Sequence, residues 1–188
     1  MGMTFPNEST AYRAARDALL EAEAALRQRT EEVAAMRRAL PAGGEMPEDY
    51  LFHRSDGSTV RTSALFAPAQ DTLAVYSFMQ GPKAVDPCPM CSAFVDALDG
   101  NAPHIRARLS LQVVISGSPA QAEALATGRG WRHIAPLSAA GSSYNRDYHG
   151  ETPDGSQWPM LNVFQKRDGI IRHFWSSELF AKEWGGHP

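Results

Sequence analysis

The chain has 188 residues, of which 43% are hydrophobic and 21% charged, and its formal net charge is −3. This length predicts about one domain with a single sizeable core. The slightly acidic balance gives no basic surface for nucleic acid. No apolar run reaches the roughly 18 residues that a membrane span needs. We therefore expect no nucleic-acid partner and no membrane partner.

Residues 8–40 carry a strong helical pattern. Apolar side chains recur every seven positions, and a second row between them is interrupted by Arg29. The pattern predicts one helix about 45 Å long at 1.5 Å per residue. Its 3.5-residue spacing suits a seam between two helices, so the stripe either packs along its own domain or pairs with a second copy. We expect a homodimer through this helix. The two rows are Tyr12, Leu19, Leu26, Val33 and Leu40, then Ala15, Ala22 and Met36.

A linker rich in Pro and Gly follows at residues 41–47. Asp56-Gly57 lies between the β-prone runs 50–53 and 59–61, which predicts a hairpin. The chain then alternates between strand and helix patterns, and Ser118 is placed to cap the second helix. In chain order we predict a strand at 72–79, a helix at 91–99 that residues 100–103 end, a strand at 109–116, a helix at 119–126 and a short strand within 131–137.

The last part of the chain begins with a polar stretch at 142–157, which predicts an irregular surface loop. Two β-prone runs at 160–164 and 170–175 flank a turn that ends in Asp168-Gly169, which predicts an antiparallel hairpin. A last short helix would contain Leu179, Phe180 and Trp184. The order of elements predicts an α/β sheet that is parallel first and antiparallel at its end.

Cys88 and Cys91 are the only cysteines, and they lie where the first helix of this alternation begins. A helix N-terminus offers unpaired N–H groups and a partial positive charge, which favour the thiolate of Cys88. Pro89 fits the first helical turn, and Cys91 should lie below Cys88 and be less accessible. This arrangement predicts thiol–disulfide exchange with a protein or a low-molecular-weight substrate, in which Cys88 attacks and Cys91 resolves.

The main competing interpretation of the cysteines is a metal site. A structural zinc site needs four ligands, commonly with a second Cys or His pair at short spacing. The six histidines provide no such pair: they are His53, His104, His133, His149, His173 and His187. We expect no metal and no cofactor. An inert pair in a non-catalytic adaptor or interaction protein also stays open.

The compartment follows from the same two cysteines and from the N-terminus. The first residues lack a basic segment followed by an apolar core, so they predict no secretory signal. A lone Cys-x-x-Cys pair is typical of catalytic or metal-binding sites in a reducing compartment. We expect a cytoplasmic protein.

Taken together, these segments resemble the thioredoxin superfamily. The resemblance rests on residues 65–66, 72–79, 88–91, 109–116 and 159–164. The chain is most similar to a bacterial thioredoxin-like family of uncharacterised function, described as predicted dithiol–disulfide oxidoreductases. The features that carry this similarity are the long N-terminal helix, Asp96, Pro103-His104, residues 144–148 and residues 172–175.

The resemblance implies an α/β three-layer sandwich, in which a mixed sheet is flanked by helices. It also implies an N-terminal hairpin and the long N-terminal helix. Residues 1–42 would form a helical arm, and residues 43–188 would form the thioredoxin-like domain. Pro159 stands where thioredoxins carry a cis proline opposite the redox pair. A cis bond there would turn the Trp158 backbone toward a bound substrate, so the resemblance implies that Trp158 and Pro159 bind substrate.

The sequence also departs from its relatives. Thioredoxins have a buried acid on the strand before the cysteines, but this segment offers Tyr76, Ser77 and Phe78. No proton shuttle can therefore be carried over. Peroxiredoxins want a Thr three residues before the attacking cysteine, and Val85 stands there. Peroxidase activity is thus a weaker prediction than dithiol–disulfide exchange.

Overall fold

The computed structural model describes residues 3–177 and divides the chain into two compact units, Met1–Pro41 and Ala42–Pro188. Each unit is described by itself. The last helix expected around Leu179, Phe180 and Trp184 lies outside the described residues. No helix within residues 3–177 is both long enough and apolar enough to cross a lipid bilayer.

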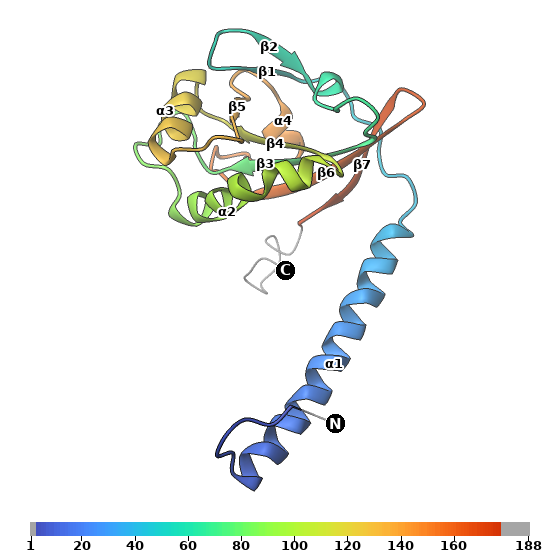
Figure 1. Cartoon of the computed structure of the whole chain (residues 1–188). Coiled ribbons are helices and arrows are strands. Elements are labelled where there is room, and N and C mark those ends of the chain that lie inside the picture. The colour runs from blue at the N-terminus through green and yellow to red at the C-terminus, as the bar shows by residue number, and fades with distance from the viewer. Residues whose placement is uncertain (1–2, 178–188) are drawn as a thin grey trace. The chain divides into compact units, whose positions relative to one another are not determined.

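The first unit is built on one long helix, α1 (Thr10–Arg38), as the heptad pattern predicts (Figure 1). It begins at Ser9, whose side chain accepts a hydrogen bond from the Tyr12 N–H at 3.1 Å. This cap satisfies one of the free N–H groups of the first turn. Arg37 and Arg38 lie in the last turn, where positive charge complements the helix dipole.

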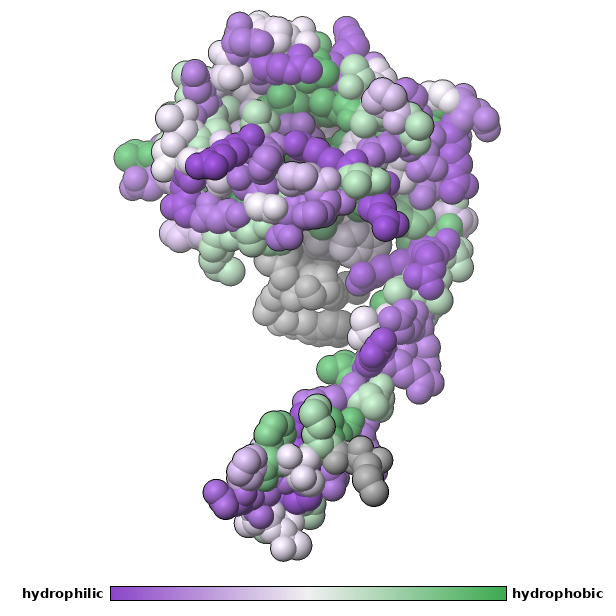
Figure 2. Space-filling model, in the orientation of Figure 1, coloured by the Kyte–Doolittle hydropathy of each residue, from purple (hydrophilic) through white to green (hydrophobic). Residues whose placement is uncertain are grey.

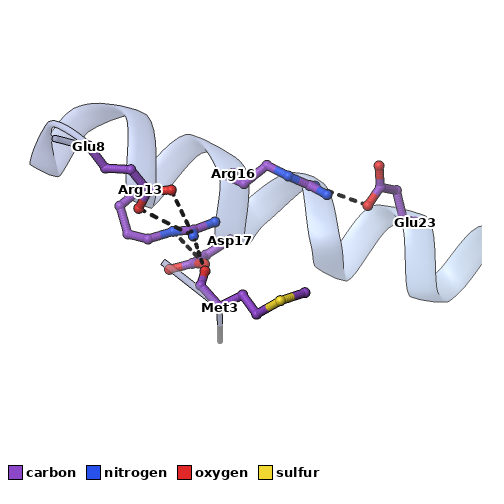
Figure 3. Close-up of polar contacts among 6 residues, drawn as sticks. All are labelled: Met3, Glu8, Arg13, Arg16, Asp17 and Glu23. Atoms are coloured by element: carbon purple, nitrogen blue, oxygen red, sulfur yellow. Dashed lines mark hydrogen bonds and ion pairs between the residues drawn. The ribbon is translucent and has the colours of Figure 1, made fainter. Parts of the chain in front are cut away.

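Ion pairs lie along the N-terminal half of α1 and at its N-terminus (Figure 3). Arg13 contacts the carboxylates of Glu8 and Asp17, and Arg16 contacts Glu23. None of the residues of α1 is buried. Hydrophobic and hydrophilic residues lie interspersed on the surface of this unit (Figure 2).

The second unit contains one mixed sheet. Within residues 3–177 its strand order is β2-β1-β5-β4-β3-β6-β7 (Figure 1). β4 pairs parallel with both β3 and β5, whereas β6 pairs antiparallel with β3 and β7. The strands are β1 (Leu51–His53), β2 (Thr59–Arg61), β3 (Thr72–Phe78), β4 (Ser110–Ile115), β5 (Leu137–Ser138), β6 (Met160–Arg167) and β7 (Ile170–Ser176).

Helices cover both faces of this sheet. The buried side chains of α2 (Pro89–Arg106) and α3 (Pro119–Arg129) pack with Tyr76 and Phe78 of β3 on one face. On the other face, α4 (Tyr144–Asp147) packs with Leu73 and Val75 of the same strand. The alternation of β3 thus separates two cores. The predicted thioredoxin-like α/β sandwich, with its N-terminal hairpin β1–β2, is confirmed.

Helix α2 is longer than predicted. It passes through Pro103 and ends at Arg106, although we expected residues 100–103 to end it. A proline inside a helix costs about 3 kcal/mol. Tertiary contacts offset this cost, because Ala102 is fully buried and Arg106 donates hydrogen bonds to the carbonyl oxygens of His133 and Leu111.

The polar stretch 142–157 is only in part the irregular surface loop that we predicted, because residues 153–156 are exposed but residues 144, 145 and 150 are buried. It contains α4, and both Tyr144 and Asn145 are buried. The Tyr144 ring lies 5.4 Å from the Tyr50 ring and 5.3 Å from the Phe52 ring, both in edge-on contacts. Burial of this large ring in an aromatic cluster stabilises the segment against the sheet.

Two smaller elements also differ from expectation. The short strand expected within residues 131–137 is only Leu137–Ser138. The turn between β6 and β7 is shorter than predicted, because β6 continues to Arg167. Asp168 and Gly169 alone form this turn, and both have positive φ, at 53° and 79°. That backbone is the one that two-residue hairpins favour.

Candidate redox site

Cys88 lies at the point where the loop after β3 enters α2. It is the N-cap residue of α2, and Pro89 occupies the first helical position. The Ser92 N–H donates to the Cys88 carbonyl oxygen at 2.9 Å and so forms the first helical bond. Cys88 therefore lies at the N-terminus of α2, where the N–H groups of the first turn have no partner within the helix, and its side chain makes no capping hydrogen bond.

The two cysteines differ in exposure as their spacing predicts. Cys88 is half-buried, whereas Cys91 has only 1% of its surface exposed. Both thiols are free, and they lie about one helical turn apart at the start of α2. A reagent from solvent therefore meets Cys88 first, and Cys91 is placed to react with whatever is bonded to Cys88.

Tyr76 of β3 contacts Cys91 from the sheet face on which α2 packs. The Tyr76 hydroxyl donates a hydrogen bond to Cys91 Sγ at 3.3 Å, and only 1% of the Tyr76 surface is exposed. Burial, together with this hydrogen bond, raises the pKa of Tyr76 far above the ordinary value of a phenol. The hydroxyl therefore keeps its proton and remains a donor toward the sulfur at every physiological pH.

Burial raises the pKa of Cys91 to about 11. The Tyr76 hydroxyl and the backbone N–H of Met79 oppose this rise, because each donates to the sulfur and favours the thiolate. The hydrogen bond and the charge of Cys88 add to the rise. Cys91 is therefore a thiol at neutral pH, and the influence of Cys88 on it changes once Cys88 is covalently modified.

A pocket of about 350 Å³ opens next to both cysteines. It brings the two predicted substrate-binding residues, Trp158 and Pro159, together with Cys88 and Cys91. Within residues 3–177, no Asp, Glu, Lys or Arg lines it. The sequence did not single out its other lining residues, which are Tyr76, Met79, Met90, Phe94 and Gln157.

Pro159 is not cis as the resemblance implied, because residues 3–177 contain no cis peptide bond. The segment before it is held in extended form by a β-bridge between Glu151 and Gln157 and by the Trp158 N–H, which donates to the Gly150 carbonyl oxygen at 3.0 Å. From there the chain runs straight into β6, which the lower-energy trans bond allows. Pro159 lines the pocket all the same.

The position of Trp158 depends on Gly150. A Cβ at Gly150 would come within 2.6 Å of Asn145 Oδ1 and 2.7 Å of Ser77 Oγ, so only glycine allows this close approach. Asn145 is buried and bonded to Ser77 and to Ser116 of the sheet. This polar contact fixes residue 150, and residue 150 in turn holds the Trp158 backbone.

Acidic residues near the cysteines serve the packing of α2. Asp96 accepts hydrogen bonds from Arg129 and from the Trp131 indole N–H. Asp99 accepts from three consecutive backbone N–H groups, at 3.1, 2.8 and 2.8 Å, which belong to Arg132, His133 and Ile134. Neither carboxylate lines the pocket.

The part of the chain described by the structure contains no group of three or more His, Cys, Asp or Glu side chains placed to share a metal ion. Cys88 and Cys91 therefore offer only two ligands. Zinc prefers four protein ligands in structural sites and three in catalytic ones.

One family matches nearly the whole sequence. The sequence profile of a family described as "Bacterial protein of unknown function (DUF899)" matches residues 3–184. No curated protein matches the chain.

Several solved structures share the fold. Peroxiredoxin Q from Xanthomonas campestris, in a mutant form, aligns with a TM-score of 0.54 at 13% identity, over 73% of this chain and 87% of its own. A hypothetical protein from Sinorhizobium meliloti aligns with a TM-score of 0.50 at 15% identity, over 74% and 71%. An exposed lipoprotein thioredoxin from Streptococcus pneumoniae gives 0.48 at 16% identity, over 67% and 87%. At 13% identity the alignment with peroxiredoxin Q shows the fold alone, which is thioredoxin-like.

Proposed function

The chain belongs to the DUF899 family of bacterial proteins, and we propose that it is a thiol–disulfide oxidoreductase in which Cys88 attacks and Cys91 resolves. One observation carries the proposal. A half-buried thiol at a helix N-terminus lies beside a buried thiol that accepts a hydrogen bond from Tyr76, at the edge of an open pocket. We expect the reaction to take place in a reducing cytoplasm, where a single dithiol pair can cycle.

The first step uses the exposure of Cys88. Its thiolate attacks one sulfur of a substrate disulfide, the substrate S–S bond breaks, and the other half leaves as a thiolate that takes a proton from water. The new bond joins Cys88 Sγ to the retained half of the substrate. The N-terminus of α2 favours the negative charge of the attacking sulfur, and the pocket beside it receives the retained group.

The second step uses the proximity of Cys91. Cys91 loses its proton to solvent, and its thiolate attacks Cys88 Sγ. The bond from Cys88 to the substrate breaks, the substrate half leaves as a thiolate, and a Cys88–Cys91 disulfide forms. The pair has given two electrons to the substrate. An external dithiol restores both thiols by the reverse exchange, and the same steps run backwards oxidise a substrate dithiol.

Tyr76 supports the second step. Because Cys91 is buried, its thiolate needs a donor in place of water. The Tyr76 hydroxyl and the Met79 N–H supply two. Tyr76 keeps its proton throughout. It therefore stabilises the Cys91 thiolate by a hydrogen bond and does not act as a base. It stands on the strand where thioredoxins carry an acid.

Peroxidase chemistry has less support at this site. Peroxiredoxins want a Thr hydroxyl three residues before the attacking cysteine, whereas position 85 is a Val with 92% of its surface exposed. A non-catalytic adaptor is the other alternative. In an adaptor, Cys88 and Cys91 would not alternate between the dithiol and the disulfide, and the exposed helix α1 could bind the partner.

The test is catalysis of disulfide reduction. Dithiothreitol reduces bis(2-hydroxyethyl) disulfide slowly, and we expect the protein to accelerate the reaction in proportion to its concentration. Cys88→Ser should abolish the acceleration. Cys91→Ser should slow the reaction. Without Cys91, a dithiothreitol molecule from solution must attack each mixed disulfide on Cys88 to free the substrate half. A rate that wild-type protein does not raise above that of dithiothreitol alone would reject the enzyme and favour the adaptor.

A further inference from the structure

The pocket beside Cys88 has the character of a binding site for a small apolar group. The residues within 3–177 that line it include no Asp, Glu, Lys, Arg or His, and most are aromatic or sulfur-containing: Tyr76, Met79, Cys88, Met90, Cys91, Phe94, Gln157, Trp158 and Pro159. The pocket has an opening to solvent at Cys88, which is half-buried. Such a site favours an apolar group, because an apolar group gives up no hydrogen bonds with water when it is buried.

The volume limits the size of that group. At about 30 Å³ for each non-hydrogen atom, the volume that a water molecule has in the liquid, 350 Å³ holds about ten to twelve atoms. A benzyl or a short alkyl group fits. A glutathionyl group is larger, and it carries two carboxylates and an ammonium group that would find no counter-charge on this lining.

Three hydrogen-bond donors of the pocket lining are already bonded within the protein. The Tyr76 hydroxyl donates to Cys91, and the Gln157 amide donates to Glu151 and to the Gly155 carbonyl oxygen, each at 3.3 Å. The Trp158 backbone N–H donates to the Gly150 carbonyl oxygen at 3.0 Å. That N–H is therefore not offered to the backbone of an extended peptide. The Glu151 carboxylate held by Gln157 also disfavours an anionic substrate at this side.

Met90 at the rim supplies the last observation. It lies in the first turn of α2 and lines the pocket, yet 75% of its surface is exposed. A group bonded to Cys88 would cover part of this apolar surface as it enters. Met adapts its shape to irregular apolar ligands.

We propose that this pocket binds the uncharged apolar group of a low-molecular-weight disulfide while that group is bonded to Cys88. The proposal rests on the proposed function and names its substrate class. The substrate disulfide carries an alkyl or aryl group of about ten non-hydrogen atoms or fewer. Attack by Cys88 leaves that half in the pocket and releases the other half to solvent.

The test measures how fast methanethiosulfonate reagents modify Cys88. The Cys88 thiolate takes the thioalkyl group and methanesulfinate leaves, so the product is the mixed disulfide itself. We would use methyl, benzyl, anionic sulfonatoethyl and cationic trimethylammonioethyl reagents on Cys91→Ser protein, in which resolution is blocked. Each rate is divided by the rate for the same protein unfolded in guanidinium, which removes the intrinsic reactivity of the reagent.

We expect the normalised benzyl rate to exceed the methyl rate and both charged rates by about tenfold or more, as burial of one aromatic group implies. Met90→Lys should lower the benzyl preference at least about threefold, because it adds a charge at the rim. Val85→Lys is the matched control. It adds the same charge three residues before Cys88, at an exposed position outside this pocket, and should leave the preference unchanged.

Three results would overturn the proposal. The first is a benzyl rate no higher than the methyl or charged rates, and the second is an equal loss in Met90→Lys and Val85→Lys. The third is faster modification by a peptide disulfide with Phe beside its Cys than by the benzyl reagent, which would assign the site to polypeptides. All three leave the exchange chemistry intact. Failure of every reagent, methyl included, to modify folded Cys88 would instead reject the proposed function.

Discussion

The Tyr76 hydroxyl lies 3.3 Å from Cys91 Sγ, and both side chains are almost wholly buried between β3 and α2. A strand residue thus donates to the sulfur that must become the second nucleophile. Burial is the largest cause of a net rise in the pKa of Cys91 to about 11, which leaves little thiolate near neutral pH. The phenol opposes this effect without adding a charge to the core.

The first prediction concerns Tyr76→Phe. The reagent 2,2′-dithiodipyridine releases one thiopyridone when Cys88 attacks and a second when Cys91 resolves, so stopped-flow absorbance separates the two steps. We expect the second phase to slow about tenfold or more, because a hydrogen bond to an ionised group is worth roughly 1.5–3 kcal/mol. The rate of the second phase rises with pH as Cys91 ionises, and in Tyr76→Phe this rise should occur at higher pH. The rate of the first phase should change little.

Tyr50→Phe is the control for this variant. It also removes a partly buried hydroxyl with one partner, Asp147 at 2.8 Å, but on the opposite face of the sheet. The two variants should lose similar stability, and only Tyr76→Phe should slow the second phase. Equal second phases in the two variants would mean that Tyr76 merely fills space below Cys91.

The second prediction concerns alkylation of the two thiols in the wild-type protein. With a pKa of about 11, only about a thousandth of Cys91 is thiolate at pH 8. Its burial also keeps reagents away. Iodoacetamide should therefore label Cys88 at least about a hundredfold faster than Cys91, as read by peptide mass spectrometry. Labelling should equalise in guanidinium. Comparable labelling of both thiols in folded protein at pH 8 would contradict the buried position of Cys91.

The start of α2 and the exposure order of its cysteines were predictable because they depend on local rules. A proline after Cys88 marks a first helical position, and a three-residue spacing places Cys91 one turn further in. The end of α2 was not predictable in this way. Pro103 is a helix breaker locally, and only the tertiary contacts of Ala102 and Arg106 overrule it.

The site was predicted in part. Cys88 and Cys91 follow from their spacing, and Trp158 and Pro159 follow from a family resemblance whose cis bond is absent. The role of Tyr76 was missed. The two-residue alternation of β3 contains a signal for it, because Tyr76 is the polar-tipped residue on the face that packs against α2. Its contact with Cys91 depends on the register of helix on strand, which sequence alone does not fix.

The segment 142–157 was also mispredicted in part because its structure depends on contacts with residues that are distant in sequence. Its composition is polar, so local rules predict a loop, yet Tyr144 and Asn145 are buried. The ring of Tyr144 contacts aromatic rings on β1 and β6, and the amide of Asn145 bonds to hydroxyls of Ser77 on β3 and of Ser116 just after β4. These partners are far away in sequence. A polar composition therefore does not place a segment on the surface when such partners exist.

The third prediction concerns Asp99 and pH. Burial raises the pKa of this carboxyl, but the N–H groups of Arg132, His133 and Ile134 outweigh that effect and the net pKa is lowered. A lowered pKa in the folded state stabilises the protein above the unfolded pKa of about 3.9, and the benefit is lost as pH falls through the folded value. Asp99→Ala should therefore lower the free energy of unfolding by about 1–2 kcal/mol at neutral pH.

Urea unfolding of wild type and Asp99→Ala at about pH 7 and about pH 3 measures this effect. The difference between the two proteins should be largest at neutral pH and should shrink at the acidic one. A difference that does not change between the two pH values would show that Asp99 contributes through packing alone.

The fourth prediction concerns helix α1. Its seven-residue rows leave Leu19 and Leu26 with 51% and 68% of their surfaces exposed. The helix spans about four heptads, which is long enough for a two-stranded coiled coil. We propose that a second copy of the chain covers these rows. The double variant Leu19→Glu/Leu26→Glu should then be monomeric by light scattering at concentrations where the wild type is a dimer.

Leu20→Glu is the control for the helix. Leu20 is also exposed, but it lies outside the two rows, so this variant should remain a dimer. A wild-type protein that is monomeric at high concentration would contradict the pairing. Equal dissociation by the double variant and by Leu20→Glu would contradict the assigned face.

The central claim is that Cys88 forms the mixed disulfide and Cys91 releases it. The most direct measurement is the intact mass of Cys91→Ser protein after brief exposure to an excess of 2,2′-dithiodipyridine. We predict one stable thiopyridyl adduct, mapped to Cys88, whereas wild-type protein should carry no adduct and should be two mass units lighter through its Cys88–Cys91 disulfide. An adduct that persists equally in wild type, or no adduct in Cys91→Ser, would contradict the claim.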